Sequence, residues 1–310
     1  MKSSLSQCKE WIIQQLKCEG ASRIGIAGAE AVNQTDVNRF RDWISNGWHG
    51  EMQYLDRYHD ERNDPRRLLD GARSIISVVF NYYTPREESP LQWATYALGD
   101  DYHEVVRAKL TRVAKEISET TGAACRVCVD TAPIRERYWA ARSGIGFIGR
   151  NNQLIIPGAG SYFFLGEILT TLELEVDPPL LNVGCGNCRR CIEACPGKAL
   201  HEDGCMDSRR CLSYLTIEHR GKFPADVPIE RHIYGCDECQ RACPYNRHAS
   251  ATTLPEFTPR TEILQLTVDD IREMSQERFS TLFRHSAIKR RKLSGLQRNL
   301  SFCVGDPEKS

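Results

Sequence analysis

The chain of 310 residues carries 41 Lys and Arg against 41 Asp and Glu, so its formal net charge is zero. This balance excludes a histone-like or polybasic protein, and any nucleic-acid partner must be held by a local patch of charge. The length suggests about two domains, and the hydrophobic fraction of 41% excludes a disordered or integral membrane protein.

The first zone, residues 1–179, alternates helical and strand patterns. An amphipathic helix is predicted around Trp11 and Leu16, and a second helix over 102–121 with Gly122 as its stop. Strands are predicted at 23–27, 74–80, 124–130 and 162–171. We therefore expect an α+β fold, with a mixed α/β catalytic domain that ends near Asp177 before two prolines.

No segment of the sequence predicts attachment to a membrane. The longest apolar stretch, 154–172, is interrupted by Pro157, three glycines and Glu167, so it cannot form a continuous apolar helix across a bilayer. The first twenty residues mix charged and apolar side chains and contain no export signal. We expect a cytoplasmic protein, in which cysteine thiols stay reduced.

Nine of the fourteen cysteines lie between Cys185 and Cys243, which indicates metal binding rather than disulfides. Residues 185–196 read C-x2-C-x2-C-x3-C-P, the spacing of bacterial ferredoxins, in which three cysteines bind one cluster and the fourth binds the other. A second run, C-x2-C-x3-C-P over 236–244, lacks one member. Cys211 is its natural substitute. The second zone, 180–249, is therefore predicted to be a ferredoxin-like domain with two 4Fe-4S clusters.

The ferredoxin crossover predicts which thiols share a cluster. Cluster one is expected on Cys185, Cys188, Cys191 and Cys243. Cluster two is expected on Cys195, Cys211, Cys236 and Cys239. Two zinc sites of four cysteines each fit the count, but explain neither the C-P ends nor the crossover. The remaining six cysteines are interpreted as small hydrophobes or surface thiols. Among them, Cys125 and Cys128 should face opposite sides of a strand.

About 180 residues precede the clusters, so we expect a catalytic domain that receives their electrons. Asp130 closes a predicted strand and Pro133 suits the first turn of the next helix, which places a carboxylate where a catalytic acid is often found. A helix cap or a surface acid is the alternative for Asp130. The glycines of 144–149 match a dinucleotide-binding pattern, but a helix-like segment precedes them where a strand is required.

Several tracts together resemble the epoxyqueuosine reductases, cobalamin-dependent iron-sulfur enzymes of tRNA modification. They are DTAPIRER at 130–137, GIGFIGRNN at 144–152, FFLGEI at 163–168, CLSYLTIE at 211–218 and DDYH at 100–103, together with both cysteine runs. The resemblance implies cobalamin, bound base-off between the first domain and the ferredoxin-like domain. It also implies reduction of epoxyqueuosine to queuosine at the wobble position 34 of tRNA, with loss of water.

The resemblance further implies which residues surround the ligands. Near cobalamin it places Arg57, Asp130, Asn151, Asn152, Leu212, Ser213 and Thr216. Near the substrate it places Tyr102, His103 and Arg137. Because the cofactor supplies the nucleophile, Asp130 is expected to act as a buried carboxyl of raised pKa that protonates the alkoxide. Solvated ion pairs for the arginines and an exposed helix start for His103 are the structural alternatives.

The third zone, 250–310, is predicted to be helical at 268–283 and basic after it. Residues 284–298 contain no acid and six basic residues: Arg284, Lys289, Arg290, Arg291, Lys292 and Arg298. Longer family members carry a HEAT-like repeat domain that grips tRNA, and this zone resembles a truncated form of it. Lys289, Arg290 and Arg291 are therefore expected to bind tRNA, with a solvated basic helix as the alternative.

The expected partners are tRNA carrying epoxyqueuosine and an external low-potential electron donor, and we expect a monomer. Two other functions fit the cysteine runs. One is a cytosolic cobalamin-dependent reductive dehalogenase, and the other is a non-enzymatic electron carrier with two clusters.

Overall fold

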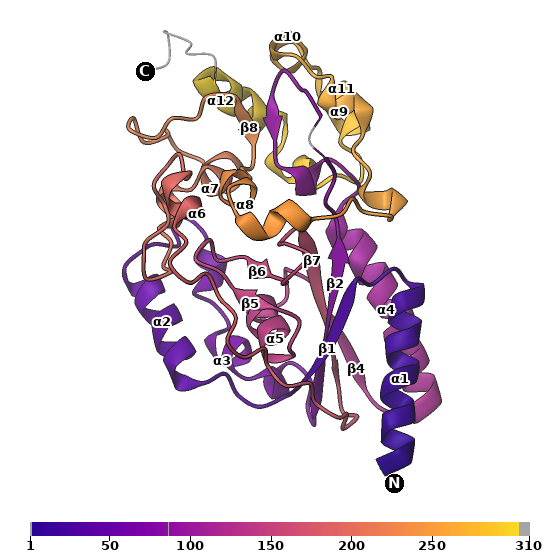
Figure 1. Cartoon of the computed structure of the whole chain (residues 1–310). Helices are drawn as coiled ribbons and strands as arrows, with labels where there is room; N and C mark the ends of the chain where they lie inside the picture. Colours follow the sequence, from indigo (N-terminus) through magenta and orange to yellow (C-terminus); the bar gives the residue numbers. More distant parts are fainter. Residues whose placement is uncertain (1, 86, 304–310) are drawn as a thin grey trace.

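The protein is described here by a computed structural model, which covers residues 2–85 and 87–303. At its centre is a four-stranded antiparallel sheet in the order β1-β2-β7-β4 (Figure 1). The strands are β1 (Arg23–Gly28), β2 (Ser74–Asn81), β4 (Cys125–Cys128) and β7 (Phe163–Thr170). All neighbours run antiparallel, which confirms the α+β class. The strand predicted at 124–130 ends at Cys128, so Asp130 lies in the loop beyond it.

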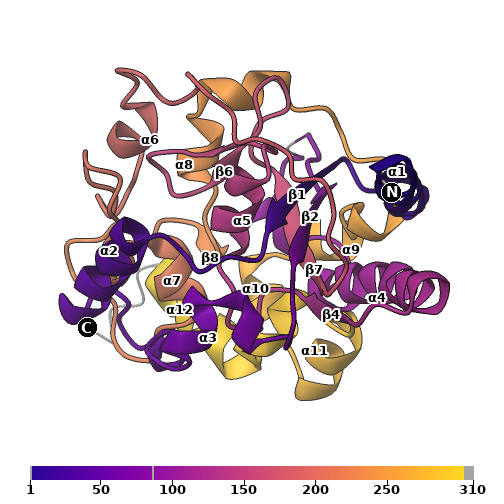
Figure 2. The same cartoon turned by 90° about the horizontal axis from the view of Figure 1, so that it is seen from below.

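Alternating side chains of β2 face two different helical layers, as the pleat of a strand requires. Ile76, Val78 and Phe80 pack in the core of α1 (Lys2–Cys18) and α4 (Tyr102–Thr121). Figures 1 and 2 both place α1 and α4 on one side of the sheet. The opposite side faces α5 (Glu136–Arg142), with α2 (Gln34–Ser45) and α3 (His59–Asn63) further out.

The two cysteines of β4 occupy different layers. Cys125 packs against the α1 and α4 core, whereas Cys128 is fully buried in the core on the α5 side. The opposite orientation predicted for them is therefore confirmed.

Helix α4 fixes the first residues of the candidate site. The Asp101 carboxylate caps its N-terminus and accepts the backbone N–H of His103 at 3.0 Å. The helix ends at Gly122, whose φ of 73° is the left-handed conformation that favours glycine. The predicted start and stop of this helix are both confirmed.

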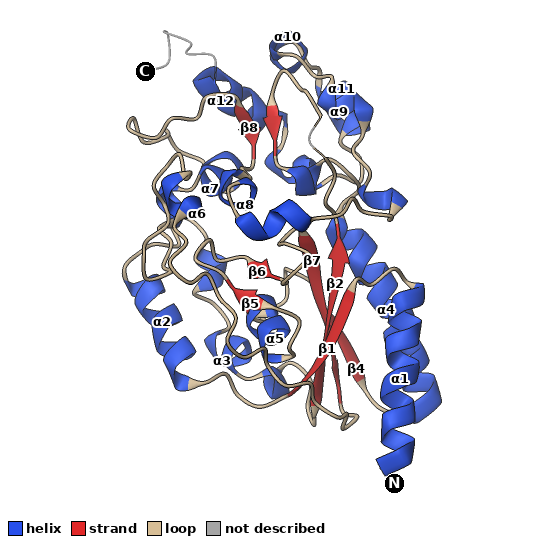
Figure 3. Cartoon of the chain, viewed as in Figure 1, coloured by secondary structure: helices blue, strands red, loops and turns tan. Residues whose placement is uncertain are grey.

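The cysteine-rich loops and the C-terminal helices lie at one end of the sheet, and Figure 3 shows that this part contains mostly short helices and loops. A hairpin of β5 (Phe147–Ile148) and β6 (Leu154–Ile155) lies between the sheet and this part. The loops carry α6 (Arg190–Glu193), α7 (Leu212–Ile217) and α8 (Glu238–Arg241). The last zone carries α9 (Thr261–Leu264), α10 (Val268–Arg272), α11 (Gln276–Leu282), the 3-10 turn η7 (Ala287–Arg291) and α12 (Leu293–Cys303).

The single helix predicted at 268–283 is wrong, because two helices replace it. The Ser275 side chain accepts the backbone N–H of Arg278 at 3.1 Å and so starts α11 as a new helix.

One segment of the first zone belongs to the core of the last. Strand β3 (Gln92–Trp93) pairs in parallel with β8 (His232–Tyr234). Leu91 and Leu98 are buried in one cluster with Ile233 of β8 and with Leu296 and Leu300 of α12. Within the part of the chain that the structure describes, no helix has both the length and the apolar character needed to span a bilayer.

Candidate functional site

A cavity of about 440 Å³, here called the catalytic cavity, lies between the sheet domain and the cysteine-rich loops. Eight residues predicted to bind cofactor or substrate line it: Tyr102, His103, Asp130, Arg137, Asn151, Leu212, Ser213 and Arg290. Four thiols line it as well: Cys195, Cys211, Cys236 and Cys239. The fold thus brings one cysteine set and the DTAPIRER tract to the same space.

His103 lies between two carboxylates at the edge of this cavity. Its Nδ1 is 2.7 Å from Asp101 Oδ1, and its Nε2 is 2.9 Å from Asp130 Oδ2. Both ring nitrogens therefore face acceptors, which is the arrangement that suits a doubly protonated imidazolium. The ring of Tyr102 stacks on that of Phe164 with centroids 4.4 Å apart and fixes the start of the helix beside the pair.

The proton of this pair is held on the histidine. Burial alone would lower the pKa of His103, but hydrogen bonds to Asp101 and Asp130 outweigh it and raise this pKa to about 9. Burial would raise the pKa of Asp130, but the hydrogen bond and charge of His103 lower it below its usual value. The raised pKa expected for Asp130 is therefore wrong, because a cation lies against the carboxylate.

Asp130 is held in an unusual backbone conformation, with a φ of 50°. Its backbone N–H donates to Glu136 Oε1 at 2.5 Å. Burial and then the charge of Asp130 raise the pKa of Glu136. Pro133 lies in the loop before α5, so the expectation that it occupies the first turn of the helix is wrong. Two contacts therefore hold this loop in place: Glu136 accepts the Asp130 backbone N–H, and His103 bonds to the Asp130 carboxylate.

A second carboxyl, Glu167, lies behind this loop on β7. It pairs across the sheet with Ser77 and with Cys128. It is fully buried, and neither of its oxygens has a hydrogen-bond partner within the protein. Burial and then the Glu136 carboxyl raise the pKa of Glu167 well above its usual value, so this side chain is held neutral.

Some residues predicted to bind ligands do not line the catalytic cavity. Arg57 is exposed, and Asn152 donates its amide to the Gly204 carbonyl at 2.9 Å. Thr216 is fully buried, where its hydroxyl donates to the Leu212 carbonyl and accepts the N–H of Gly235. Thr216 therefore joins α7 to the loop that precedes Cys236.

The basic C-terminal run is only partly available to a ligand. Lys289 is exposed, and Arg290 pairs with Glu218 at 2.6 Å beside the cavity. Arg291 is only 2% exposed, and burial lowers its pKa to about 10. Arg298 donates to three backbone carbonyls and lies over the Phe223 ring at 4.2 Å. The structure thus corrects the expectation of a phosphate contact for Arg291, and it gives Arg298 a packing role.

Several cavity residues were missed by sequence reasoning. The Ser208 hydroxyl is buried with no partner within the protein, and it lines the cavity. A buried hydroxyl without a partner fits a polar ligand at this position. The aromatic residues Tyr54, Tyr82, Tyr96 and Tyr234 also line it. Glu218 belongs to the CLSYLTIE tract and could have been found there, whereas no motif signals Ser208.

The other four cysteines line a separate cavity of about 560 Å³, which they share with Tyr245 and His248. They are Cys185, Cys188, Cys191 and Cys243. Burial, and then the thiols of Cys185 and Cys243, raise the pKa of Cys191. In the other set, burial and then Cys211 and Cys236 raise the pKa of Cys239. Four thiols gathered around a cavity form the donor set of a 4Fe-4S cluster. Within the described ranges, no three His, Cys, Asp or Glu side chains converge on a single metal ion.

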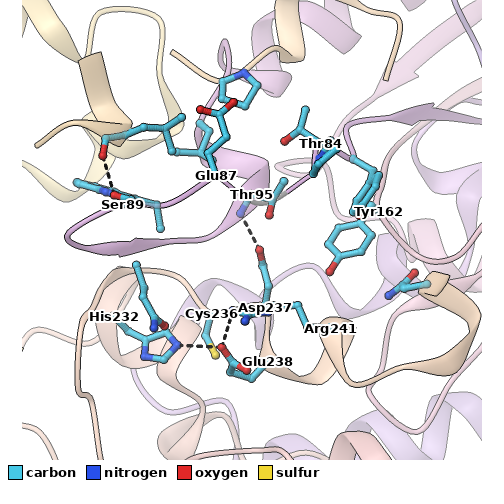
Figure 4. A pocket seen from close by; sticks show the side chains of 18 of the residues that line it. Thr84, Glu87, Ser89, Thr95, Tyr162, His232, Cys236, Asp237, Glu238 and Arg241 are labelled. Carbon is cyan, nitrogen blue, oxygen red and sulfur yellow. Dashed lines mark hydrogen bonds and ion pairs between the residues drawn. The ribbon is translucent and has the colours of Figure 1, made fainter. Parts of the chain in front are cut away.

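A third cavity, of about 400 Å³, lies where the Cys236 loop meets the segment around β3 (Figure 4). Asp237 accepts the backbone N–H of Thr95 at 2.7 Å. Glu238 pairs with Arg241 at 2.8 Å and with His232 at 3.7 Å. These contacts attach the loop of Cys236 and Cys239 to the core that contains β3. Glu87 also lines this cavity.

The comparisons with known proteins agree with this geometry. Residues 62–131 match the family described as "Epoxyqueuosine reductase QueG, DUF1730". Residues 184–246 match the "4Fe-4S double cluster binding domain". The second match confirms two 4Fe-4S clusters and excludes the zinc alternative.

Curated relatives extend over almost the whole chain. The epoxyqueuosine reductase of Leadbetterella byssophila is 38% identical over 97% of this chain and 99% of that protein. The epoxyqueuosine reductase of Gloeobacter violaceus is 40% identical over 92% of each.

Solved structures show the same fold. An epoxyqueuosine reductase with an epoxyqueuosine-modified tRNA-Tyr stem loop matches with a TM-score of 0.90 and 28% identity, over 97% of this chain and 81% of that one. The epoxyqueuosine reductase of Bacillus subtilis, with its catalytic loop swung out of the active site, matches with a TM-score of 0.88 and 28% identity, over 97% of this chain and 82% of that one. The extent and identity of these matches show that the chain is an oxidoreductase of the epoxyqueuosine reductase family.

Proposed function

We propose that the catalytic cavity is where epoxyqueuosine at the wobble position 34 of tRNA is reduced to queuosine, the reaction of the family. The observation that carries this proposal is the His103–Asp130 pair, which faces the same cavity as the thiols of Cys195, Cys211, Cys236 and Cys239. A pair that holds a proton and the thiols of a one-electron cluster therefore line the same cavity. The proposed place of action is the cytoplasm, the proposed state is a monomer, and the electrons come from an external low-potential donor.

Cobalamin is the cofactor that the family implies, and reduced cobalt supplies a strong nucleophile toward an epoxide carbon. The chain's own residues fit such a group. Leu212 and Ser213 line the cavity from the cluster side and Asn151 from the sheet side, while the Ser208 hydroxyl offers an unused hydrogen bond. Asn151 is itself oriented, because its Oδ1 accepts the N–H of Gln153 at 3.2 Å.

The proton chemistry is assigned to His103 and Asp130. The oxygen released from the epoxide must take up protons to leave as water, and the imidazolium of His103 holds one at neutral pH. Asp130 accepts the hydrogen bond of His103 at 2.9 Å and lines the cavity with it, so it can pass that proton onward through its carboxylate. Tyr102 and Arg137 line the same side and are proposed to position the substrate.

Conversion of epoxyqueuosine-containing tRNA by the holoprotein, with dithionite as reductant, tests the proposal directly. Loss of epoxyqueuosine with formation of queuosine is expected, and the absence of turnover in protein loaded with both clusters and cobalamin would contradict it. Reductive dehalogenase structures are only distantly similar to this chain, with TM-scores of 0.45 to 0.48.

The Glu136 contact gives a test of how the catalytic loop is held. Glu136→Ala removes the acceptor of the Asp130 N–H and is expected to reduce turnover about twofold to tenfold, which corresponds to roughly 0.5–1.5 kcal/mol for a hydrogen bond between neutral groups. Glu136→Gln keeps an acceptor oxygen and should restore most of the rate. Cluster content and tRNA affinity should match wild type in both. Equal rates for the Ala and Gln variants would contradict an anchoring role.

The proposed tRNA contact is tested at the exposed lysines Lys289 and Lys292. Replacing both by Ala is expected to weaken tRNA binding and flatten the slope of log affinity against log salt by about 1.5 units, since each phosphate contact contributes roughly 0.7 to 0.9. Lys115→Ala, at an exposed lysine on α4 behind the sheet, is the control. An unchanged slope would place the tRNA elsewhere, such as on Arg137 and Arg142. Arg291 is left intact because it is buried.

A further inference from the structure

The cavity of Cys185, Cys188, Cys191 and Cys243 adjoins an unusually apolar stretch of surface. In the described part of the chain, four of the seven exposed large hydrophobic side chains lie between Val176 and Val183. Leu181 is 81% exposed, Leu180 40% and Val183 39%. This stretch leads directly to Cys185, so apolar side chains are presented to solvent beside the proposed cluster one.

A further exposed apolar residue, Ile148, comes from a part of the chain that contacts the same segment. Gly144 packs against the Pro178 carbonyl, where an added Cβ would come within 2.5 Å. Further along, the Arg150 backbone N–H donates to Cys185 Sγ at 3.4 Å. Ile148, 46% exposed, lies between these two contacts. Ile148, Leu180, Leu181 and Val183 are called the apolar patch from here on.

The surroundings of the patch are basic. The segment that carries Ile148, residues 142–155, contains Arg142 and Arg150 and no acid. The segment that carries the rest of the patch, residues 176–193, contains Arg189 and Arg190 against Asp177 and Glu193. Asp177 is already paired with Lys9 at 2.6 Å, and Arg189 with Glu202 at 2.6 Å. Arg150 also donates its guanidinium to the Cys188 carbonyl at 2.7 Å, so positive charge adjoins the cysteine loop itself.

The two thiol sets are placed unequally with respect to the catalytic cavity. The set of Cys211 lines that cavity, whereas the set of Cys185 lines the separate one next to the patch. An electron on its way to the catalytic cavity would therefore enter the protein at the Cys185 set and pass to the Cys211 set. The cavity of Figure 4 also touches Cys236, but its lining sets Glu87, Asp237 and Glu238 against Arg241 and Arg247, so it offers no excess of positive charge to an acidic partner.

We propose that the apolar patch and its arginine border form the docking surface for a small acidic one-electron carrier protein. The inference rests on the proposed function and names the partner that supplies it. Exposed apolar side chains suit the core of a protein interface, while arginines at the rim attract an acidic partner. An RNA would use the arginines but would leave the apolar side chains without a role.

The electron balance requires two docking events per substrate. Reduction of one epoxide to an alkene takes up two electrons and two protons and releases one water. Each encounter delivers one electron, so the carrier is oxidised once per encounter and must leave before the next arrives. A surface that binds briefly, with charge attraction at its rim, suits this exchange.

The test compares a protein carrier with a small reductant on the holoprotein. The probe is a reduced ferredoxin of low isoelectric point, and dithionite is the small reductant. Arg190→Glu and Leu181→Ser should each raise the KM for the ferredoxin about tenfold, as expected for a rim charge or a patch anchor. Lys115→Glu makes the same charge reversal on α4 and should leave that KM unchanged. Turnover with dithionite, iron content and tRNA affinity should match wild type in all three.

Each departure from these results has a definite meaning. An unchanged ferredoxin KM in both patch variants would overturn the docking surface. A loss of tRNA affinity would assign the surface to RNA instead. If Glu87→Lys alone changed the ferredoxin KM, electrons would enter through the cavity of Figure 4. Failure of the wild-type holoprotein with dithionite would count against the proposed function and not against the surface.

Discussion

Asp130→Asn is expected to slow reduction of epoxyqueuosine by about 100-fold to 10,000-fold, which is the usual contribution of general acid catalysis to a rate. The amide keeps the shape of the side chain but cannot pass a proton from His103 to the cavity. Single-turnover conversion of epoxyqueuosine-containing tRNA measures the effect. Iron content, cobalamin binding and tRNA affinity should remain at wild-type values, and a wild-type rate would return Asp130 to a structural role.

The same pair predicts how the rate depends on pH. The His103 imidazolium is present below its pKa of about 9, so turnover should fall as the pH rises through that value. Asp130→Asn removes one of the two carboxylates that raise this pKa, so the residual rate should fall at a lower pH. An identical descending limb in both proteins would contradict the pairing.

The contribution of this pair to folding stability also falls as the pH rises. Because His103 has a higher pKa in the folded chain than its ordinary value of about 6.5, the contribution of the pair is complete below pH 6.5 and is lost as the pH rises through about 9.

Cys211→Ala is expected to halve the iron content, from about eight atoms per chain to about four, because each cluster holds four irons. Cys211 lines the catalytic cavity together with Cys236 and Cys239. Turnover should fall below one hundredth of the wild-type rate, since electrons could no longer reach the cavity. Anaerobic reconstitution followed by iron and sulfide analysis measures the cluster content.

Cys205→Ala is the matched control, because this cysteine is in the same zone but lines neither thiol cavity. Its backbone N–H donates to Asp203 at 2.9 Å, a contact that survives loss of the thiol. Eight irons are expected in this variant. Equal iron loss in both variants, or zinc in place of iron, would contradict the proposed ligand sets.

The sequence was most informative where chemistry depends on spacing along the chain. Cysteines with two or three residues between them carry the ferredoxin pattern, and the structure gathers the same two sets of four around two cavities. The stop of α4 was predicted because Gly122 acts on its immediate neighbours, and its start followed from the helical spacing of 102–121.

Properties that depend on distant neighbours were not predictable in this way. The pKa of Asp130 is set by His103, twenty-seven residues away, and its direction was the reverse of that expected. Arg291 and Arg298 looked like members of a solvated basic run, but packing of the last helices buries one and turns the other onto backbone carbonyls. No local pattern distinguishes them from the exposed Lys289.

The parallel pairing of β3 with β8 has a consequence for the order in which the molecule assembles. Strand β8 directly precedes Cys236, and its inner side is covered by α12, the last helix in the described chain. During synthesis from the N-terminus, Leu91 and Leu98 must wait for partners about two hundred residues later. The loop that carries Cys236 and Cys239 therefore acquires its final shape near the end of translation. Cys243, which completes the Cys185 set, follows that loop in the chain. Neither set of four thiols is therefore complete before this segment is in place, so the two clusters should mature together and late.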